Sequence, residues 1–226
     1  GRELYASDGP VSAYQAITKP YSCPMSTALV WFRRDLRLTD HPALRAACER
    51  HERVLPVFID APDEEAPWAP GAASRWWLHH SLKALGDSLA ALGAPLVLRR
   101  GDSLAELRTL IAEIGASAVY WSRLYEPAII ARDTRVKDAL SSDGIEVESF
   151  NSALLCEPWT LRTGSGDPYR VFTPFWRNAS ARLGHPAPLA APAQIHVPDK
   201  LPASLPLLSL GLLPKIVWDD GLYAHW

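Results

Sequence analysis

Cysteine and long apolar stretches are both scarce in this 226-residue sequence. The three cysteines, Cys23, Cys48 and Cys156, lie far apart, and their spacing is not that of a metal site. An odd number of dispersed cysteines fits a reducing compartment better than a disulfide framework, so we expect a cytoplasmic protein. Every apolar run ends well short of the roughly 20 residues that a membrane helix requires, so no membrane span is predicted.

An excess of positive charge is also lacking. The chain has 23 Lys and Arg against 25 Asp and Glu, for a net charge of -2, and the two signs are interspersed. A chain that grips nucleic acid by itself carries a basic face that displaces phosphate counterions. We therefore do not expect this chain to hold nucleic acid unaided.

The N-terminal segment lacks the features of a targeting sequence. The only methionine, Met25, follows residues 1–24, which contain no apolar stretch of the signal-peptide kind. We interpret residues 1–24 as a tag or N-terminal extension and Met25 as the natural start.

Between residues 28 and 150, short β-rich runs alternate with helical patterns. This alternation is typical of βαβ units and a parallel sheet. The run ALVWF at 28–32 is apolar without alternation, as expected of a strand covered on both faces. We predict an α/β fold, a Rossmann-like, doubly wound, five-stranded parallel sheet with helices on both faces, followed by an irregular linker. Strands are predicted at 28–32, 54–59, 96–98, 118–122 and 147–150, and helices at 42–50, 72–92, 104–114 and 128–140.

Local signals mark the ends of these helices. Asp40 stands just before Pro42, and Ser103 with Glu106 has capping-box spacing, so both pairs predict helix starts. Glycines at 93, 115 and 144 predict helix ends.

The pattern changes after residue 150. A Gly/Pro loop leads to a short aromatic helix, and prolines and leucines dominate from 186 to 214. Residues 201–213, LPASLPLLSLGLL, are too apolar for a free linker and too proline-rich for a core helix. We expect them to be poorly ordered or buried against another molecule. We divide the chain into an α/β domain at 25–155 and an interdomain loop, short helix and linker at 156–226, with a partner domain missing.

Charged residues follow the first predicted strand where a nucleotide loop would be expected. Neither a G-x-G-x-x-G motif nor a Walker lysine loop is present there. In their place stand Arg33, Arg34, Asp35 and Arg37. One interpretation is an Arg-Asp network that braces the turn, and the other is that Arg33 or Arg37 meets an anionic or aromatic ligand.

The segment WSRLYEP, residues 121–127, leaves the fourth predicted strand beside the first. Arg123, Tyr125 and Glu126 could stack on and hydrogen-bond a planar ring. The alternative is an ordinary surface ion pair.

Other candidate chemistry is weak. Trp76 and Trp77 point about 100° apart on a helix, so one of them is expected to face a neighbour or ligand. His79 and His80 are adjacent and do not converge on one ion, so no metal site is predicted. We find no catalytic arrangement of side chains in the sequence.

Three motifs resemble the photolyase/cryptochrome family, especially bacterial cyclobutane-dimer photolyases. They are LVWFRRDLRLTDHPAL, YEP and TGSGDPYRVFTPFW, and the resemblance runs from about Ala28 to the end of the chain. It implies the N-terminal α/β antenna domain of a deoxyribodipyrimidine photo-lyase, which splits pyrimidine dimers in DNA by electron transfer from light-excited reduced FAD. The FAD, and the contacts with UV-damaged DNA, would belong to a missing C-terminal helical domain, so this chain alone is expected to be inactive.

The resemblance also implies an antenna chromophore. Arg33, Asp35, Arg37, Arg123, Tyr125 and Glu126 match the region that lines its site. Folate-binding relatives have an Asn-Glu pair where this chain has Ala128 and Ile129, which cannot hydrogen-bond a pterin. A flavin-type antenna, FMN or deazaflavin, is therefore favoured over methenyltetrahydrofolate, and an empty pocket is the further alternative.

Two other functions stay open. One is a cryptochrome-type blue-light photosensor, and the other is a stand-alone nucleotide- or flavin-binding electron-transfer module. The glycines and aromatics of TGSGDPYRVFTPFW are interpreted as a tight loop and an interdomain packing surface. The apolar linker is expected to let the fragment self-associate.

Overall fold

The computed structural model describes residues 26–66, 69–184, 187–216, 218, 219 and 221. The interpretation of residues 1–24 lies outside these ranges. Within them, no helix is long and apolar enough to cross a membrane.

Five parallel strands form one sheet in the order β3-β2-β1-β4-β5. The central strand has all six residues buried, because it pairs on both sides and is covered on both faces. The predicted Rossmann-like sheet is thus confirmed, and every strand begins and ends within two residues of its predicted range. The strands are β1 (Thr27–Phe32), β2 (Arg53–Asp60), β3 (Val97–Arg100), β4 (Ala118–Ser122) and β5 (Glu146–Phe150).

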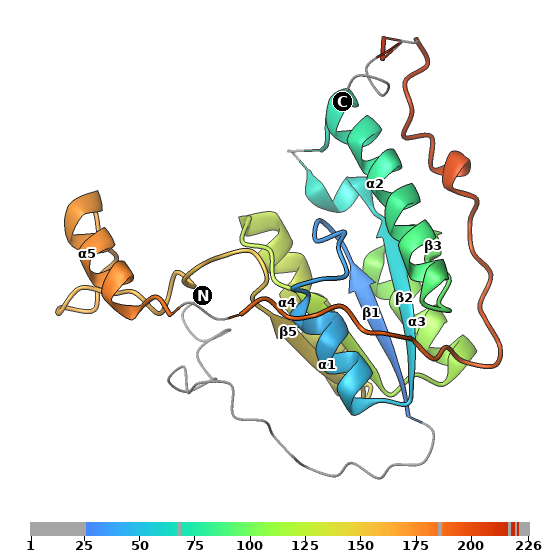
Figure 1. Ribbon diagram of the computed structural model, residues 1–226, viewed down its shortest axis with the longest axis horizontal. Helices are drawn as coiled ribbons and strands as arrows, with labels where there is room; N and C mark the ends of the chain where they lie inside the picture. The colour runs from blue at the N-terminus through green and yellow to red at the C-terminus, as the bar shows by residue number, and fades with distance from the viewer. Residues whose placement is uncertain (1–25, 67–68, 185–186, 217, 220, 222–226) are drawn as a thin grey trace.

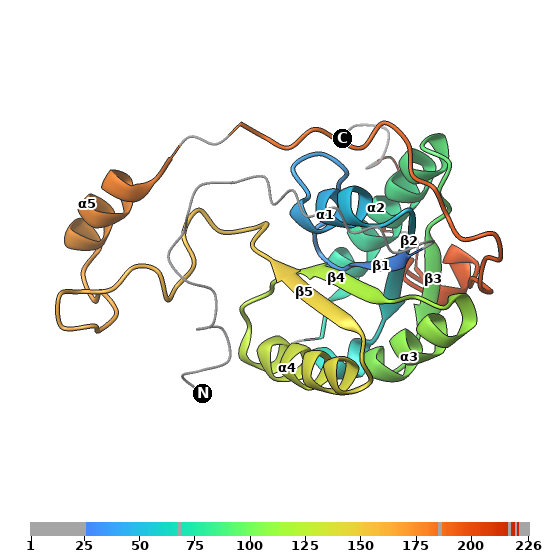
Figure 2. The same ribbon diagram turned by 90° about the horizontal axis from the view of Figure 1, so that it is seen from below.

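Two pairs of helices cover the two faces of the sheet. Helices α1 (Pro42–Arg50) and α2 (Ala72–Ala91) lie on one face, and α3 (Ser103–Ile114) and α4 (Pro127–Ser142) lie on the other (Figure 2). Each face has its own apolar core, because side chains of β1 alternate between the α1/α2 layer and the α3/α4 layer. A short 3-10 helix, η1 (Pro62–Glu65), follows β2.

The predicted helix starts need correction. Helix α3 is capped by Asp102, whose side chain accepts the Ala105 N–H, and not by Ser103. Ser103 instead donates its hydroxyl to Glu64 of η1 at 2.6 Å, so a tertiary contact replaces the capping box. Helix α1 is capped by His41 in place of Asp40. The predicted stop at Gly115 is confirmed, since this residue has the left-handed φ of 65° that glycine tolerates.

After β5 the chain makes an excursion and returns. Residues 160–188, here called the arm, carry helix α5 (Phe172–Arg182), which stands away from the sheet (Figure 1). The chain rejoins the domain where the Leu189 carbonyl accepts the Asp40 N–H at 2.7 Å.

Residues 194–213, here called the strap, run along the α/β domain and contain the 3-10 helix η2 (Leu207–Leu210) (Figure 1). The Ile195 side chain is buried, and the His196 carbonyl accepts the Val54 N–H at 2.7 Å. Leu210 and Leu212 are buried against the domain itself. The expectation that residues 201–213 are poorly ordered or need another molecule to cover them is therefore wrong, because Leu210 and Leu212 pack against β2, β3 and α2 of the same chain, although other leucines of the segment stay exposed.

Candidate functional site at the carboxyl edge of the sheet

Three segments leave the carboxyl ends of β1, β4 and β5 at one edge of the sheet (Figure 1). They are residues 33–41, 123–126 and 151–159. The strand order reverses between the neighbouring β1 and β4, which is where open α/β sheets place their ligands. All six residues predicted for the site lie in the first two segments.

Arg33 is buried, and its charge is satisfied inside the domain. Its Nη1 donates to both carboxylate oxygens of Asp133, at 2.7 and 2.6 Å, and its Nη2 donates to the Ser122 carbonyl. Arg132 donates to the same carboxylate, and both guanidiniums lie 4.9 Å from the centre of the Trp31 ring. Burial lowers the pKa of Arg33, while the adjacent Asp133 opposes this shift. These contacts correspond to the bracing alternative, with Arg33 joining β1, β4 and α4.

Asp35 connects the same turn to the start of α1. One carboxylate oxygen accepts the Arg33 N–H at 3.0 Å, and the other lies 2.7 Å from Nε2 of His41. The Nδ1 of His41 accepts the Leu44 N–H at 3.0 Å, so its proton resides on Nε2, facing Asp35. Burial acts to raise the pKa of Asp35, but hydrogen bonds from His41, Ser122 and the Arg33 backbone outweigh it and lower the pKa strongly. Asp35 is therefore ionised at neutral pH.

Arg37 and Glu126 make contacts nearer to solvent. Arg37 Nη2 donates to the carbonyls of Asp40 and Ser152, at 2.8 and 2.7 Å, and so ties the first segment to the third. Glu126 stands at the N-cap of α4 and pairs with Arg34, and both side chains are 48% exposed. Partial burial acts to raise the pKa of Glu126, but hydrogen bonds from its backbone and from Arg34 lower it. An exposed pair of this kind contributes little to stability.

Arg123 and Tyr125 converge on a residue that the sequence did not indicate. Arg123 Nη1 donates to Glu157 Oε1 at 2.5 Å, and the Tyr125 hydroxyl donates to the same oxygen at 3.1 Å. Trp159 lies beside both, with its ring centre 5.9 Å from the Arg123 guanidinium and 6.1 Å from the Tyr125 ring. Arg123 Nη2 also donates to the Ser149 carbonyl at 2.6 Å. In the sequence, Glu157 and Trp159 are only an acidic and an aromatic residue within a Gly/Pro-rich loop. Many irregular loops contain such residues, so the sequence did not single them out.

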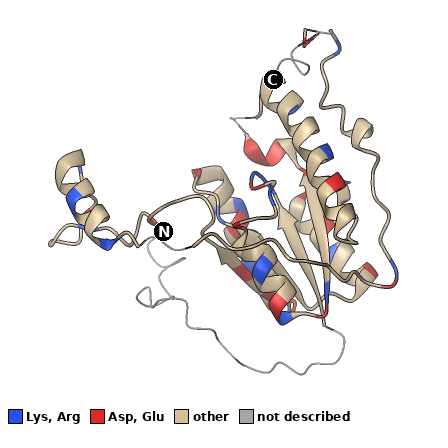
Figure 3. Cartoon of the chain, viewed as in Figure 1, with Lys and Arg blue, Asp and Glu red and all other residues tan. Residues whose placement is uncertain are grey.

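The six predicted residues therefore divide between two clusters. Arg33 and Asp35 belong to a buried ionic network, and Arg123 and Tyr125 belong to a partly buried aromatic cluster with Glu157 and Trp159. Arg37 bridges toward the second cluster through Ser152, whereas Glu126 turns to Arg34. The neighbouring strands β1 and β4 carry no charged residue, so the charges of the site come from the segments that follow them and from α4 (Figure 3). A binding role for these six residues stays a prediction.

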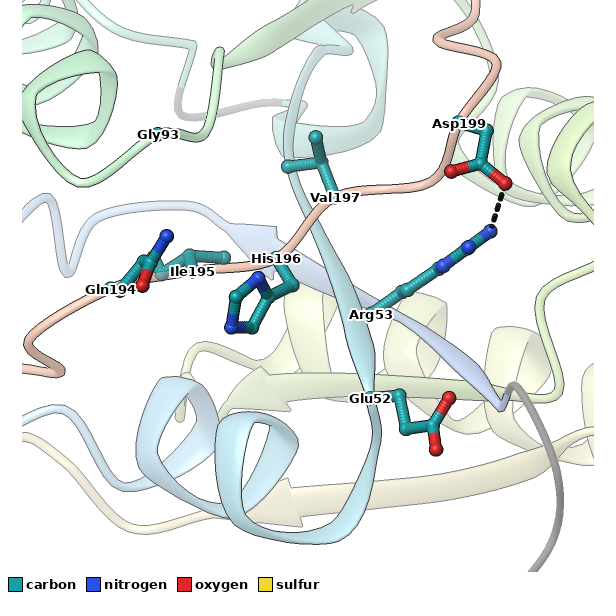
Figure 4. Close-up of a pocket in the computed structure, with 8 residues that line it drawn as sticks. All are labelled: Glu52, Arg53, Gly93, Gln194, Ile195, His196, Val197 and Asp199. Atoms are coloured by element: carbon teal, nitrogen blue, oxygen red, sulfur yellow. Dashed lines mark ion pairs between the residues drawn. The ribbon is translucent and has the colours of Figure 1, made fainter.

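A hollow of about 600 Å³ lies away from this site. It opens where the strap crosses the start of β2, and an ion pair of 2.7 Å between Arg53 and Asp199 stands at one side (Figure 4). None of the six predicted residues lines it. The lining residues are Glu52, Arg53, Gly93, Gln194, Ile195, His196, Val197 and Asp199.

The part of the chain that the structure describes contains no group of three His, Cys, Asp or Glu side chains placed to hold a metal ion.

A doubly wound parallel sheet with charged and aromatic loops at its switch point defines the class of ligand-binding, Rossmann-like α/β domains. Within that class, residues 28–193 match the family model described as DNA photolyase. The chain therefore belongs to the DNA photolyase family, and the family resemblance stated from the motifs is confirmed.

Individual relatives agree with this assignment. The deoxyribodipyrimidine photo-lyase of Agrobacterium fabrum is 45% identical over 206 residues, which are 91% of this chain and 42% of that protein. Cryptochrome-1 of Arabidopsis thaliana is 44% identical over 170 residues, which are 74% of this chain and 25% of that protein. The chain thus spans less than half of the length of either relative.

Solved structures show the same similarity. The crystal structure of a bacterial class III photolyase from Agrobacterium tumefaciens superimposes with a TM-score of 0.84 at 42% identity, covering 94% of this chain and 43% of that one. An archaeal photolyase from Sulfolobus tokodaii, crystallised with two FAD molecules, gives a TM-score of 0.68 at 26% identity, covering 87% of this chain and 45% of that one.

Proposed function

We propose that this chain is the N-terminal part of a deoxyribodipyrimidine photo-lyase, an enzyme that uses light to split cyclobutane pyrimidine dimers in DNA. The observation that carries the proposal is the 45% identity with a bacterial photo-lyase over 91% of the chain. In the whole protein, reduced FAD would pass an electron to the dimer after the lesion has left the base stack. Since the chain spans 42% of that relative, we assign FAD and the lesion site to the remaining part.

The proposed division of labour is an α/β antenna domain at 25–155 and a loop, short helix and linker at 156–226, followed in the whole protein by a helical FAD-binding domain. The net charge of -2 supports assigning the contacts with damaged DNA to that domain. Cys48 and Cys156 are free thiols, which supports a cytoplasmic location. Self-association of this chain alone would use apolar side chains that remain exposed, such as Leu208 and Ile216.

For the antenna we propose a flavin-type chromophore bound beside Arg123, Tyr125, Glu157 and Trp159. The Arg123 guanidinium and the Tyr125 ring each lie about 6 Å from the Trp159 ring, and such a combination of a cation and aromatic rings suits a planar ring system. Ile129 is 1% exposed and apolar, which supports excluding a pterin held by hydrogen bonds at that position. The archaeal relative with two FAD molecules provides a precedent for a second flavin.

The first test is repair by the whole protein. Full-length protein loaded with FAD is expected to remove cyclobutane dimers from irradiated DNA under blue light and not in the dark. Bound FAD without light-dependent repair would contradict the photo-lyase proposal. It would favour the photosensor alternative, which is supported by the 44% identity with Cryptochrome-1.

The antenna is tested on the chain itself by absorption and fluorescence after incubation with FMN, deazaflavin or methenyltetrahydrofolate. We expect a flavin-type spectrum that Trp159→Ala weakens and that Trp176→Ala, a change on the exposed arm, leaves intact. Binding of the folate alone would overturn the interpretation of Ala128 and Ile129. Tight binding of ATP or FAD by this chain without any partner would instead favour the stand-alone module.

A further inference from the structure

The strap engages the outer edge of β3. This strand is at the end of the sheet, so one side of its backbone has no neighbouring strand. The Leu98 N–H donates to Ser204 Oγ at 2.9 Å, and the Leu98 carbonyl accepts the Leu205 N–H at 2.9 Å. Both backbone groups of Leu98 are therefore satisfied by the strap.

Two leucines of the strap occupy apolar positions on the domain. Leu210 is fully buried and Leu212 is 5% exposed, and both pack with Phe58, Leu82 and Leu98. Leu208, in the same 3-10 helix, is 73% exposed and points away. Gly211 has a φ of 58°, and this left-handed residue turns the chain between the two buried leucines.

Two arginines hold three consecutive carbonyls of the strap. Arg100 donates to the Ser209 and Leu210 carbonyls, and its guanidinium is fixed by Asp60 at 2.6 and 2.8 Å. Arg75, at the start of α2, donates to the Gly211 carbonyl at 2.6 Å. Backbone carbonyls are thus recognised by charged donors, whose hydrogen bonds are stronger than those of neutral donors.

We propose that the edge of β3, the adjacent face of α2 and the two arginines form a binding site for an extended leucine-rich peptide, filled in cis by residues 203–213 of the strap. Main-chain pairing at a sheet edge, with pockets for particular side chains, is a recurrent mode of peptide recognition. The contacts are made by the segment itself and not by its connection through the arm. The site therefore accepts the same segment as a separate peptide once the cis copy is loosened.

Amide hydrogen exchange in the full chain tests the cis contact. In Leu210→Ala, the Leu205 and Leu98 amides are expected to exchange at least about tenfold faster, because a buried leucine that holds the strap is lost. Leu208→Ala is the matched control, since it removes an exposed leucine from the same short helix, and its exchange is expected to change less than about twofold. Equal exchange in the two variants would overturn the proposal.

A labelled peptide tests recognition in trans. Fluorescein-labelled peptide 201–214 is expected to show saturable anisotropy with the Leu210→Ala chain and none with the Leu208→Ala chain, where the cis segment still fills the site. The same peptide carrying the Leu210→Ala change is expected to bind neither. Absence of binding to a folded Leu210→Ala chain would show that the site does not recognise the segment and would overturn the proposal.

Folding of the variants is checked by far-UV circular dichroism. If Leu210→Ala loses its helical signal, Arg75→Gln takes its place in both measurements, because this change removes only the donor to the Gly211 carbonyl at an exposed side chain. Faster exchange at Leu205 together with peptide binding would support the proposal in that variant, and unchanged exchange would contradict it.

Discussion

The carboxyl edge of the sheet and the arm use the same residue types in opposite ways. At the edge, Trp31 is 1% exposed and contacts two guanidiniums that share one buried carboxylate. On the arm, Phe172 and Trp176 stack at 6.2 Å and remain 70% and 46% exposed, and α5 carries basic but no acidic residues (Figure 3). Arginine and tryptophan side chains are thus buried at the sheet, where α4 supplies the Asp133 carboxylate. On α5, which carries no acidic residue, the same residue types stay exposed. The edge is fixed by this chain alone, whereas the aromatic face of α5 is available for further contacts.

The largest expected effect comes from removing the carboxylate of the brace. Asp133→Ala leaves the Arg33 guanidinium buried without its counter-ion, and Arg132 loses the same partner. Breaking a buried ion pair in this way costs about 3–5 kcal/mol. Urea unfolding of the two proteins is expected to show a loss of this size in the free energy of unfolding.

Asp143→Ala is the matched control. Asp143 pairs with Arg108 at 2.7 Å, but the two side chains are 42% and 49% exposed. Solvent screens this pair, so the expected loss is much smaller than that of Asp133→Ala. Similar losses of unfolding free energy in Asp133→Ala and Asp143→Ala would mean that the ion pairs of Asp133 are screened by solvent as much as an exposed surface pair.

The second prediction concerns Asp35, whose carboxylate joins the turn after β1 to His41. Asp35→Asn removes the charge while keeping the shape. We expect it to cost about 1.5–3 kcal/mol at neutral pH, the usual range for hydrogen bonds to a charged group. Thermal or urea unfolding at neutral pH measures this loss.

Asp35 also predicts how the free energy of unfolding changes with pH. The folded-state pKa of Asp35 is lowered, so its ionised form stabilises the fold fully above the unfolded pKa of about 3.9. That contribution is lost as the pH falls from there toward the folded pKa. The free energy of unfolding is therefore expected to fall more steeply on acidification in the native chain than in Asp35→Asn. If the free energy of unfolding depends on pH in the same way in both proteins, the contacts of Asp35 do not lower its pKa in the folded state.

The sequence predicted the elements of the sheet well, because their signals are local. The range of β4 and the range of α1 agree with the prediction at both ends. An uninterrupted apolar run specifies a strand covered on both faces, and a proline at a helix start needs no tertiary partner. The βαβ alternation predicts parallel strands, and the Rossmann-like topology places the fourth strand beside the first, as the pairing of β1 with β4 confirms.

The partners of the charged residues were not predictable in the same way. Asp133 lies 100 positions from Arg33, and only the packing of α4 on the sheet brings its carboxylate to the end of β1. Glu157 reaches Arg123 because β4 and β5 are neighbours and the segments that leave them contact each other. The strap was misjudged for a related reason: its leucines indicated an apolar surface, but the sequence did not reveal that β3 and α2 supply that surface.

The smallest expected effect lies on the arm. Trp176→Ala removes a large aromatic side chain that is 46% exposed and stacks mainly on Phe172 of the same helix. In this chain the free energy of unfolding is expected to change by no more than about 0.5 kcal/mol, as for other surface substitutions. In the longer protein the same change is expected to cost more, because the proposed helical domain would bury the α5 face. A loss of several kcal/mol in this chain alone would show that α5 is part of its core and would remove the contrast between the arm and the edge of the sheet.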